Sequence, residues 1–144
     1  MSGHGARTGR IGLVVGMTLA LLLGCTRAVE SMANDPLSKT HIRGLAEVDQ
    51  RKEGAHTALG KPSPSMFIRL LLPEHGRPVD QDLVDRVAAA ARREGWTVTF
   101  IPSAGGYAGR KTIEGLDVRL TITPTREGRQ IGIFMVAVNE ESLD

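Results

Sequence analysis

The chain of 144 residues has few of the features that hold a small extracellular protein together or let a chain cross a membrane repeatedly. It contains one cysteine, so it cannot form an internal disulfide. Its longest uncharged apolar run, Ile11 to Gly24, would extend only about 21 Å as a helix, whereas a bilayer core is about 30 Å thick. Aromatic residues make up only 3% of the chain, and all of them lie beyond residue 66. These shortages exclude a disulfide scaffold and a multi-span membrane protein, and they predict a densely packed core in the C-terminal half.

The chain also has almost no excess of charge of either sign. The chain has 18 basic and 16 acidic residues. Arg7 and Arg10 precede the apolar run, and no acidic residue occurs before Glu30. A positive start followed by a short apolar run is typical of an export signal. Removal of residues 1–24 would leave a neutral chain, so we expect no nucleic-acid partner.

The apolar run ends in Leu22-Leu23-Gly24-Cys25, which resembles the lipobox of bacterial lipoprotein precursors. Leu23 stands where a small residue is usual. The resemblance implies that the thiol of Cys25 receives a diacylglyceryl group and that a peptidase cleaves between Gly24 and Cys25. It thus implies that membrane lipid holds the protein at the outer face of the cytoplasmic membrane. The overall layout is similar to that of small lipoproteins of high-GC Gram-positive bacteria.

The pattern beyond Cys25 predicts a tether followed by one domain. Residues 26–37 show no sustained periodicity and contain a turn signal, so we interpret them as flexible. Apolar residues at helical spacing predict a helix over residues 38–58. Glycine and prolines over residues 60–65 then form a break. We therefore expect a signal peptide over residues 1–24, the lipidated cysteine and tether over 25–64, and the folded domain over 65–144.

The expected domain begins with a strand and a helix. Residues 66–72 are mostly apolar and lie between two prolines, which favours a strand. Residues 80–94 carry an apolar stripe at helical spacing, with Asp80 as N-cap and Gly95 as the terminating residue. Alternating residues over 96–101 predict the next strand.

The strongest alternation predicts a terminal hairpin of residues 116–123 and 131–137. We expect its register to place Ile122 opposite Ile131, Leu120 opposite Ile133, and Val118 opposite Met135. The predicted fold class is α+β, of order β-α-β-β-β, with an antiparallel sheet and one helix packed on one face. The second side of the last strand is also apolar, through Phe134, Val136 and Val138. Either the segment before Gly60 packs there, or this side is a face for a protein partner or a second copy.

Residues 102–112 (PSAGGYAGRKT) form a glycine-rich segment that we interpret as a connection between strands. They do not match a phosphate-binding loop, because Arg110 separates Gly109 from Lys111 and a strand follows. Two interpretations remain open: a flexible connection, or a recognition loop in which Tyr107, Arg110 and Lys111 contact an anionic ligand or head group.

The sequence contains no obvious catalytic set. Its histidines lack metal-ligand spacing, and it has no Gly-x-Ser-x-Gly motif. We therefore expect no metal, no cofactor and a non-enzymatic lipoprotein that binds a protein or envelope component. One alternative is a small envelope hydrolase or transferase using the carboxylates between Glu74 and Asp82. Another is a structural lipoprotein that self-associates.

Overall fold

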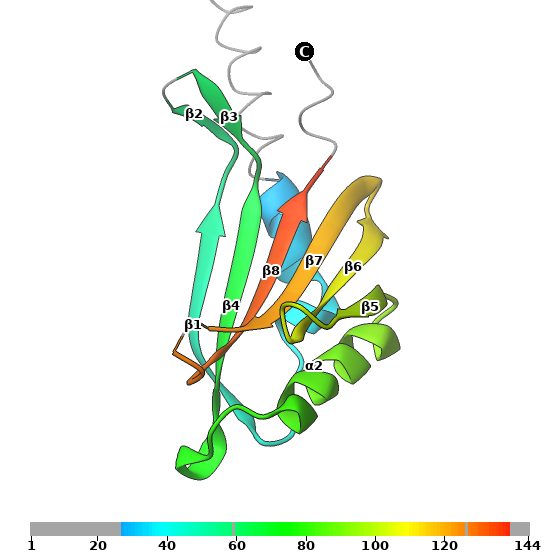
Figure 1. Cartoon of the computed structure of the whole chain (residues 1–144). Helices are drawn as coiled ribbons and strands as arrows, with labels where there is room; N and C mark the ends of the chain where they lie inside the picture. Colours follow the sequence, from blue (N-terminus) through cyan, green and yellow to red (C-terminus); the bar gives the residue numbers. More distant parts are fainter. Residues whose placement is uncertain (1–26, 59, 126, 139–144) are drawn as a thin grey trace, which may run out of the picture.

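A computed structural model describes residues 27–58, 60–125 and 127–138 (Figure 1). Six antiparallel strands form a sheet in the order β1-β4-β8-β7-β6-β5, and two short strands form a separate hairpin. The α+β class is therefore confirmed. The helical elements are a segment over residues 27–34, η1 (Pro36–Ser38), η2 (Glu74–Gly76) and α2 (Gln81–Arg93). The strands are β1 (Leu45–Glu53), β2 (His56–Ala58), β3 (Lys61–Ser63), β4 (Met66–Pro73), β5 (Thr97–Ile101), β6 (Gly106–Ile113), β7 (Leu116–Pro124) and β8 (Ile131–Ala137).

The expectation of a flexible tether over residues 26–37 is wrong for the part that the structure describes. Residues 27–34 are helical, and Ala28, Met32 and Leu37 are buried. Their apolar side chains recur at helical spacing and pack into the core that also holds the strands. The folded unit therefore starts well before residue 65.

The expected helix over residues 38–58 is also wrong, because this segment forms β1 and β2. β1 pairs antiparallel with β4 from Leu45 opposite Pro73 to Glu53 opposite Met66. Only Leu45 of β1 is buried, so the thin apolar pattern belongs to an edge strand rather than to a helix face. The break predicted over residues 60–65 contains the strand β3, which pairs with β2.

A further strand, β6, replaces most of the connection expected over residues 102–112. Its glycines make it hard to recognise, and they are required by close approach of the neighbouring backbones. A Cβ at Gly109 would lie 2.6 Å from the carbonyl oxygen of Thr97, and one at Gly106 would collide with the carbonyl oxygen of Ile122. The segment from Met66 onward is consequently β-α-β-β-β-β rather than β-α-β-β-β.

The predicted helix is confirmed as α2, together with both of its ends. The Asp80 side chain accepts a hydrogen bond from the backbone N–H of Leu83 at 2.9 Å. At the other end, Gly95 has φ +90° and donates its N–H to Arg92, while Trp96 donates to Ala91. This pair of bonds is the Schellman motif that the sequence predicted.

The terminal hairpin is confirmed, but its register differs by two residues. Leu120 lies opposite Met135 and Ile122 opposite Ile133, instead of opposite Ile133 and Ile131. A shift of two residues keeps each side chain on the same face, so the predicted buried face survives the error. The pairing extends to Pro124 opposite Ile131, which leaves a shorter turn than expected.

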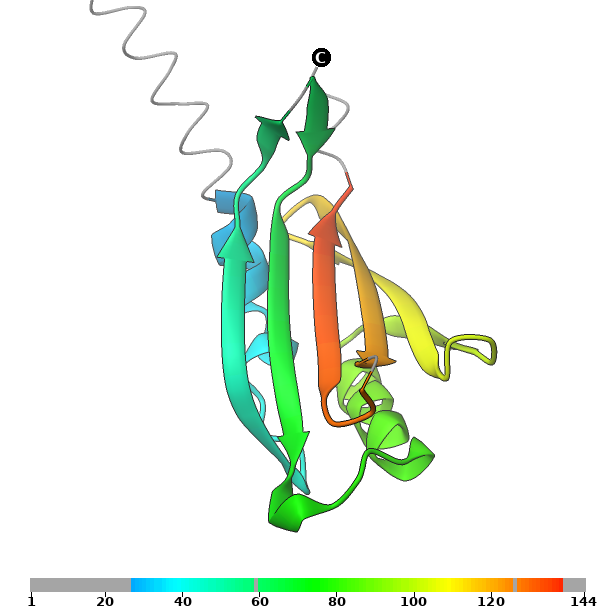
Figure 2. The same ribbon diagram turned by 60° about the vertical axis from the view of Figure 1, so that its left-hand side comes forward.

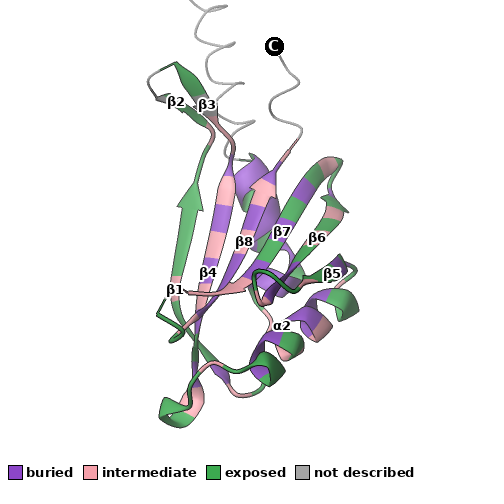
Figure 3. Ribbon diagram, in the orientation of Figure 1, coloured by how far each residue is buried: buried purple, intermediate pink, exposed green. Residues whose placement is uncertain are grey.

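The sheet has two different faces. One, here called the helix face, carries the buried residues of β4, β7 and β8 and is covered by α2 and residues 27–38 (Figures 2 and 3). The other, here called the open face, is not covered by any helix that the structure describes, as Figure 2 shows from its front. Buried and partly exposed residues alternate along β4 and β8 in accordance with these two faces.

The described residues satisfy their buried polar groups among themselves. Arg69 is 5% exposed on the helix face, yet its guanidinium donates to Glu47 at 2.7 Å and to the carbonyl oxygen of Leu37 at 3.0 Å. No buried side-chain nitrogen or oxygen in the described ranges lacks a hydrogen-bond partner. The core that the structure describes therefore buries polar side chains only where they form hydrogen bonds.

Candidate functional site

The three residues expected in a recognition loop lie on β6, and they do not converge. Tyr107 and Lys111 are on the helix face, whereas Arg110 is exposed on the open face. Successive residues of a strand point to opposite sides, so a strand cannot present all three to one ligand. The recognition-loop interpretation is therefore wrong in its geometry.

Tyr107 is buried and belongs to the packing between β6 and α2. Its hydroxyl donates to Asp85 at 2.7 Å, and its ring lies 5.3 Å from the ring of Phe100. The guanidinium of Arg92 lies 5.5 Å from the ring centroid. The hydrogen bond to Asp85, aided by burial, raises the pKa of Tyr107 above its usual value of 10.0.

Lys111 is occupied by structural contacts. Its ammonium donates to Asp35 at 2.5 Å and to the carbonyl oxygen of Glu94 at 2.7 Å. Asp35 is 3% exposed and also accepts the indole N–H of Trp96 at 3.0 Å. These contacts join the N-terminal segment, the end of α2 and β6, so Lys111 and Asp35 stabilise the fold.

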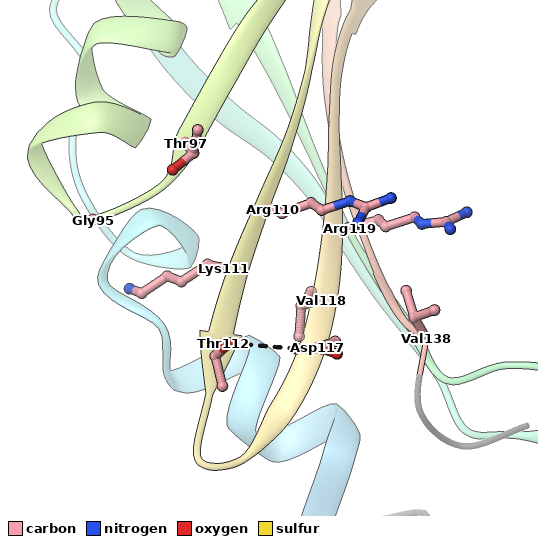
Figure 4. Close-up of a pocket in the computed structure, with 9 residues that line it drawn as sticks. All are labelled: Gly95, Thr97, Arg110, Lys111, Thr112, Asp117, Val118, Arg119 and Val138. Atoms are coloured by element: carbon pink, nitrogen blue, oxygen red, sulfur yellow. Dashed lines mark hydrogen bonds between the residues drawn. The ribbon is translucent and has the colours of Figure 1, made fainter. Parts of the chain in front are cut away.

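Arg110 instead lies beside a second arginine, which the sequence alone did not identify as part of a site. Arg119 lies directly opposite it on β7, on the same open face. Figure 4 shows the two guanidinium groups extending side by side and away from Lys111. Neither arginine forms an ion pair with any residue that the structure describes. Two cations directly opposite each other on a sheet repel, which destabilises the pairing.

The arginine pair lines a hollow of about 560 Å³, which also reaches Gly95, Lys111 and Val118 of the helix face (Figure 4). A second hollow of about 500 Å³ adjoins it and shares Arg110, Arg119 and Thr97. Hydroxyls of further threonines line both, and Asp117 lies at one border, where it accepts a hydrogen bond from Thr112 at 3.3 Å. Guanidinium groups without acidic partners, beside hydroxyl groups, can bind a carboxylate or a phosphate through paired hydrogen bonds.

One signal in the sequence could have revealed Arg119. The alternation over residues 116–123 places it on the side away from the core, among threonines. Pairing with Arg110 could not be predicted, because β6 was interpreted as a loop. The site therefore depends on β6, a strand that is hard to recognise in the sequence because of its glycines.

Three apolar residues predicted to form a partner face lie on the open face beside this pair. Phe134, Val136 and Val138 are all partly exposed. Val136 pairs directly with Arg119, and Val138 lines the larger hollow. Apolar surface and cationic surface therefore adjoin, and the partner itself stays a prediction.

Two carboxylates of the segment between Glu74 and Asp82 have structural partners. Asp80 caps α2 and binds Arg77 at 2.6 Å, and Asp82 binds Arg86 at 2.8 Å. The hydrogen bond from Leu83, followed by the one from Arg77, lowers the pKa of Asp80 below its usual value. A general acid needs the opposite shift, so Asp80 is not suited to that role, and the hydrolase alternative stays a prediction.

The remaining predictions concern lipidation, metal binding and membrane crossing. Gly24 and Cys25 lie outside the described residues. Within the residues that are described, no group of three His, Cys, Asp or Glu side chains could hold a metal ion. No helix in that same part of the chain is long and apolar enough to cross a membrane.

Comparisons with known proteins give no relative from which a role could be transferred. No protein-family model, no curated protein and no solved structure matches this chain.

Proposed function

We propose that this protein is a non-enzymatic binding module of the bacterial cell envelope. A lipid on Cys25 holds it at the outer face of the cytoplasmic membrane, and its open sheet face binds an anionic ligand through Arg110 and Arg119. The observation that carries the binding proposal is the pairing of these two arginines across β6 and β7, in a hollow, where neither forms an ion pair with a residue that the structure describes.

The anchor is supported by the order of features in the sequence. A positive start, a short apolar run and the lipobox ending at Cys25 follow one another at the spacing of an export signal. Attached acyl chains contribute about 0.8 kcal/mol per buried methylene, so two chains retain a small protein stably at a bilayer.

The anchor is tested in cells grown with radioactive fatty acid. We expect the native chain to carry label and to sediment with membranes, and Cys25→Ala to carry none. A native chain that stays unlabelled, with Cys25→Ala still in the membrane fraction, would refute the anchor.

The binding role is supported by the cost of the arginine pair. Surfaces that serve solubility intersperse charges of both signs, whereas this pair opposes like charges and has hydroxyl groups around it. A bound anion would replace the repulsion by charge-assisted hydrogen bonds.

The binding test uses the chain from residue 26 onward, because the buried core residues that the structure describes begin at Ala28. Inorganic phosphate is titrated while the side-chain Nε–H signals of the arginines are followed by NMR. We expect saturable shifts at Arg110 and Arg119, and their loss in the double variant Arg110→Gln/Arg119→Gln.

Arg93→Gln is the matched control, because Arg93 is exposed on α2, away from the open face. We expect it to leave binding unchanged. The double variant should be at least as stable as the native chain, since it removes a repulsion. Equal phosphate binding by the native chain and the stable double variant would disprove the site.

A further inference from the structure

We infer that the anionic ligand is a single lipid molecule, whose phosphate or carboxylate head group lies at Arg110 and Arg119 and whose hydrocarbon chain lies along the apolar strip of β4 and β8. This inference rests on the proposed function, and it adds the chemical class of the ligand. Its basis is the continuity between the arginine pair and the strip on one face of the sheet.

The registers of neighbouring strands place the two features in one row. On the open face, Arg110 lies opposite Arg119, Arg119 opposite Val136, and Val136 opposite Met66. Neighbouring strands are about 4.8 Å apart, so the apolar surface begins one strand away from the nearer guanidinium. A ligand held at the arginines must therefore meet apolar side chains.

The apolar strip is long enough for an extended hydrocarbon chain. On β4 it comprises alternate residues from Met66 to Leu72, which span about 20 Å at 3.3–3.4 Å per residue. Phe134 and Val136 of β8 border it, with Phe134 opposite Ile68. Most of these side chains are partly exposed, and Leu72 is 41% exposed.

Gly132 has no side chain, so the surface in the middle of this strip projects little from the sheet. The ring of Phe134 occupies the space where a side chain on Gly132 would stand. The ring therefore lies along β8 instead of projecting from the sheet. A flat apolar floor of this kind suits a hydrocarbon chain, which has no polar group to satisfy.

Charge determines which border of the strip receives the head group. At the β1 border the outward residues are Asp49, Arg51 and Glu53, and Asp49 already binds Arg51 at 3.0 Å. At the β7 border the outward charges are Arg119, with Arg110 opposite it on β6, and Asp117, so cations outnumber anions there; neither arginine forms an ion pair with any residue that the structure describes. An anionic head group is therefore attracted to the β7 border and repelled from the β1 border.

The test compares three soluble probes by titration calorimetry on the chain from residue 26 onward. These are inorganic phosphate, dodecyl phosphate below its micelle concentration, and dodecyl phosphocholine, whose head group is zwitterionic. We expect dodecyl phosphate to bind about 100-fold more tightly than phosphate, since methylene groups gain affinity when they leave water. A factor of 100 corresponds to about 2.8 kcal/mol. Dodecyl phosphocholine should bind at least 10-fold more weakly than dodecyl phosphate.

Two variants separate the head group from the chain. Arg110→Gln/Arg119→Gln should abolish binding of phosphate and reduce binding of dodecyl phosphate. Val136→Thr should weaken dodecyl phosphate about 5-fold and leave phosphate binding unchanged. Val48→Thr is its matched control, because Val48 is exposed at the irregularity of β1 and lies off the strip.

The outcomes distinguish this inference from the proposed function. If phosphate binds at the arginines but dodecyl phosphate binds no more tightly, the lipid inference fails and the anion site stands. If neither probe binds, both fail. If the chain binds vesicles of anionic phospholipid but no monomeric probe, the open face docks on a bilayer and the single-lipid inference is overturned.

Discussion

Replacing Asp35 with asparagine should destabilise the protein by about 2–3 kcal/mol. The carboxylate is 3% exposed and accepts three hydrogen bonds, from the ammonium of Lys111, the indole of Trp96 and the backbone N–H of Leu37. Asparagine has nearly the same size, so it creates no cavity. It removes the negative charge, however, and places an amide donor where acceptors are needed.

The magnitude follows from the exposure of the two partners. Removing one member of a fully buried ion pair costs about 3–5 kcal/mol, whereas exposed pairs contribute about 0–1 kcal/mol. The Asp35 side chain is 1% exposed and that of Lys111 21% exposed. Lys111 also keeps the carbonyl oxygen of Glu94 at 2.7 Å, which limits the cost of leaving its charge unpaired. The expected value therefore lies between the two limits.

Urea unfolding measures this cost through the fluorescence of the single tryptophan, with circular dichroism as a second probe. For a slope of about 1.5 kcal/mol per molar, the midpoint should fall by about 1.3–2 M urea. Glu30→Gln is the control in the same segment, because Glu30 and Lys52 are 3.5 Å apart and both about half exposed. It should cost less than about 0.5 kcal/mol.

A double-mutant cycle isolates the ion pair. Asp35→Asn combined with Lys111→Gln should be less destabilising than the sum of the single changes by about 1–2 kcal/mol. If Asp35→Asn were as mild as Glu30→Gln, the N-terminal segment would not be part of the core, and the reasoning would be refuted.

Three further predictions concern β6 and α2. The only tyrosine, Tyr107, should titrate above pH 10 when its absorbance at 295 nm is followed, and Asp85→Asn should lower its pKa toward 10. The hydrogen bond from the neutral Tyr107 hydroxyl stabilises the fold fully below pH 10. This stabilisation is lost as the pH rises through the raised pKa. An unchanged titration in Asp85→Asn would contradict this account. Gly95→Ala should cost about 1–2 kcal/mol in urea unfolding, because φ is +90° there, whereas Gly54→Ala, with open space around it, should stay within about 0.5 kcal/mol. Gly109→Ala should cost about 1–3 kcal/mol, because its Cβ would force β5 away, and a cost as small as that of Gly54→Ala would argue against the β5–β6 pairing.

Local signals predicted the parts of the fold that are determined locally. The helix α2 has a cap at Asp80, a terminating Gly95 and an apolar stripe between them, so its bounds could be derived without knowledge of the rest. The hairpin of β7 and β8 has strict alternation, which fixes the buried face. Alternation does not fix the register in steps of two residues, and the error was of that size.

The errors fall where long-range pairing overrides local pattern. β1 is an edge strand with charged residues on both faces, so its pairing with β4 leaves little trace in composition. β6 contains Gly106 and Gly109, which normally indicate turns. Here they allow neighbouring backbones to approach, and that requirement becomes visible only once the neighbouring strands are known.

The candidate site could be predicted in part. Arg110 was identified, and Val136 was expected on an apolar outward side. Tyr107 and Lys111 were assigned to the same site because a loop can present neighbouring residues together. On a strand, Tyr107 and Lys111 point to the face opposite that of Arg110. The residue that does lie beside Arg110 is Arg119, nine positions later in the sequence.

The early start of the fold changes what a lipid on Cys25 would do. Ala28 is 2% exposed and follows Cys25 by only three residues in the sequence, so the folded unit begins close to the lipidation position along the chain. Ser31 binds Glu114 at 2.6 Å, which places the N-terminal helical segment at the end of the sheet where β6 turns into β7, near the end of β8 (Figure 1). Arg119 lies about 13 Å along β7 from that turn. A lipidated chain would thus be held with this end toward the bilayer and its arginine pair close to the head groups, so an anionic lipid would reach the open face without a long tether.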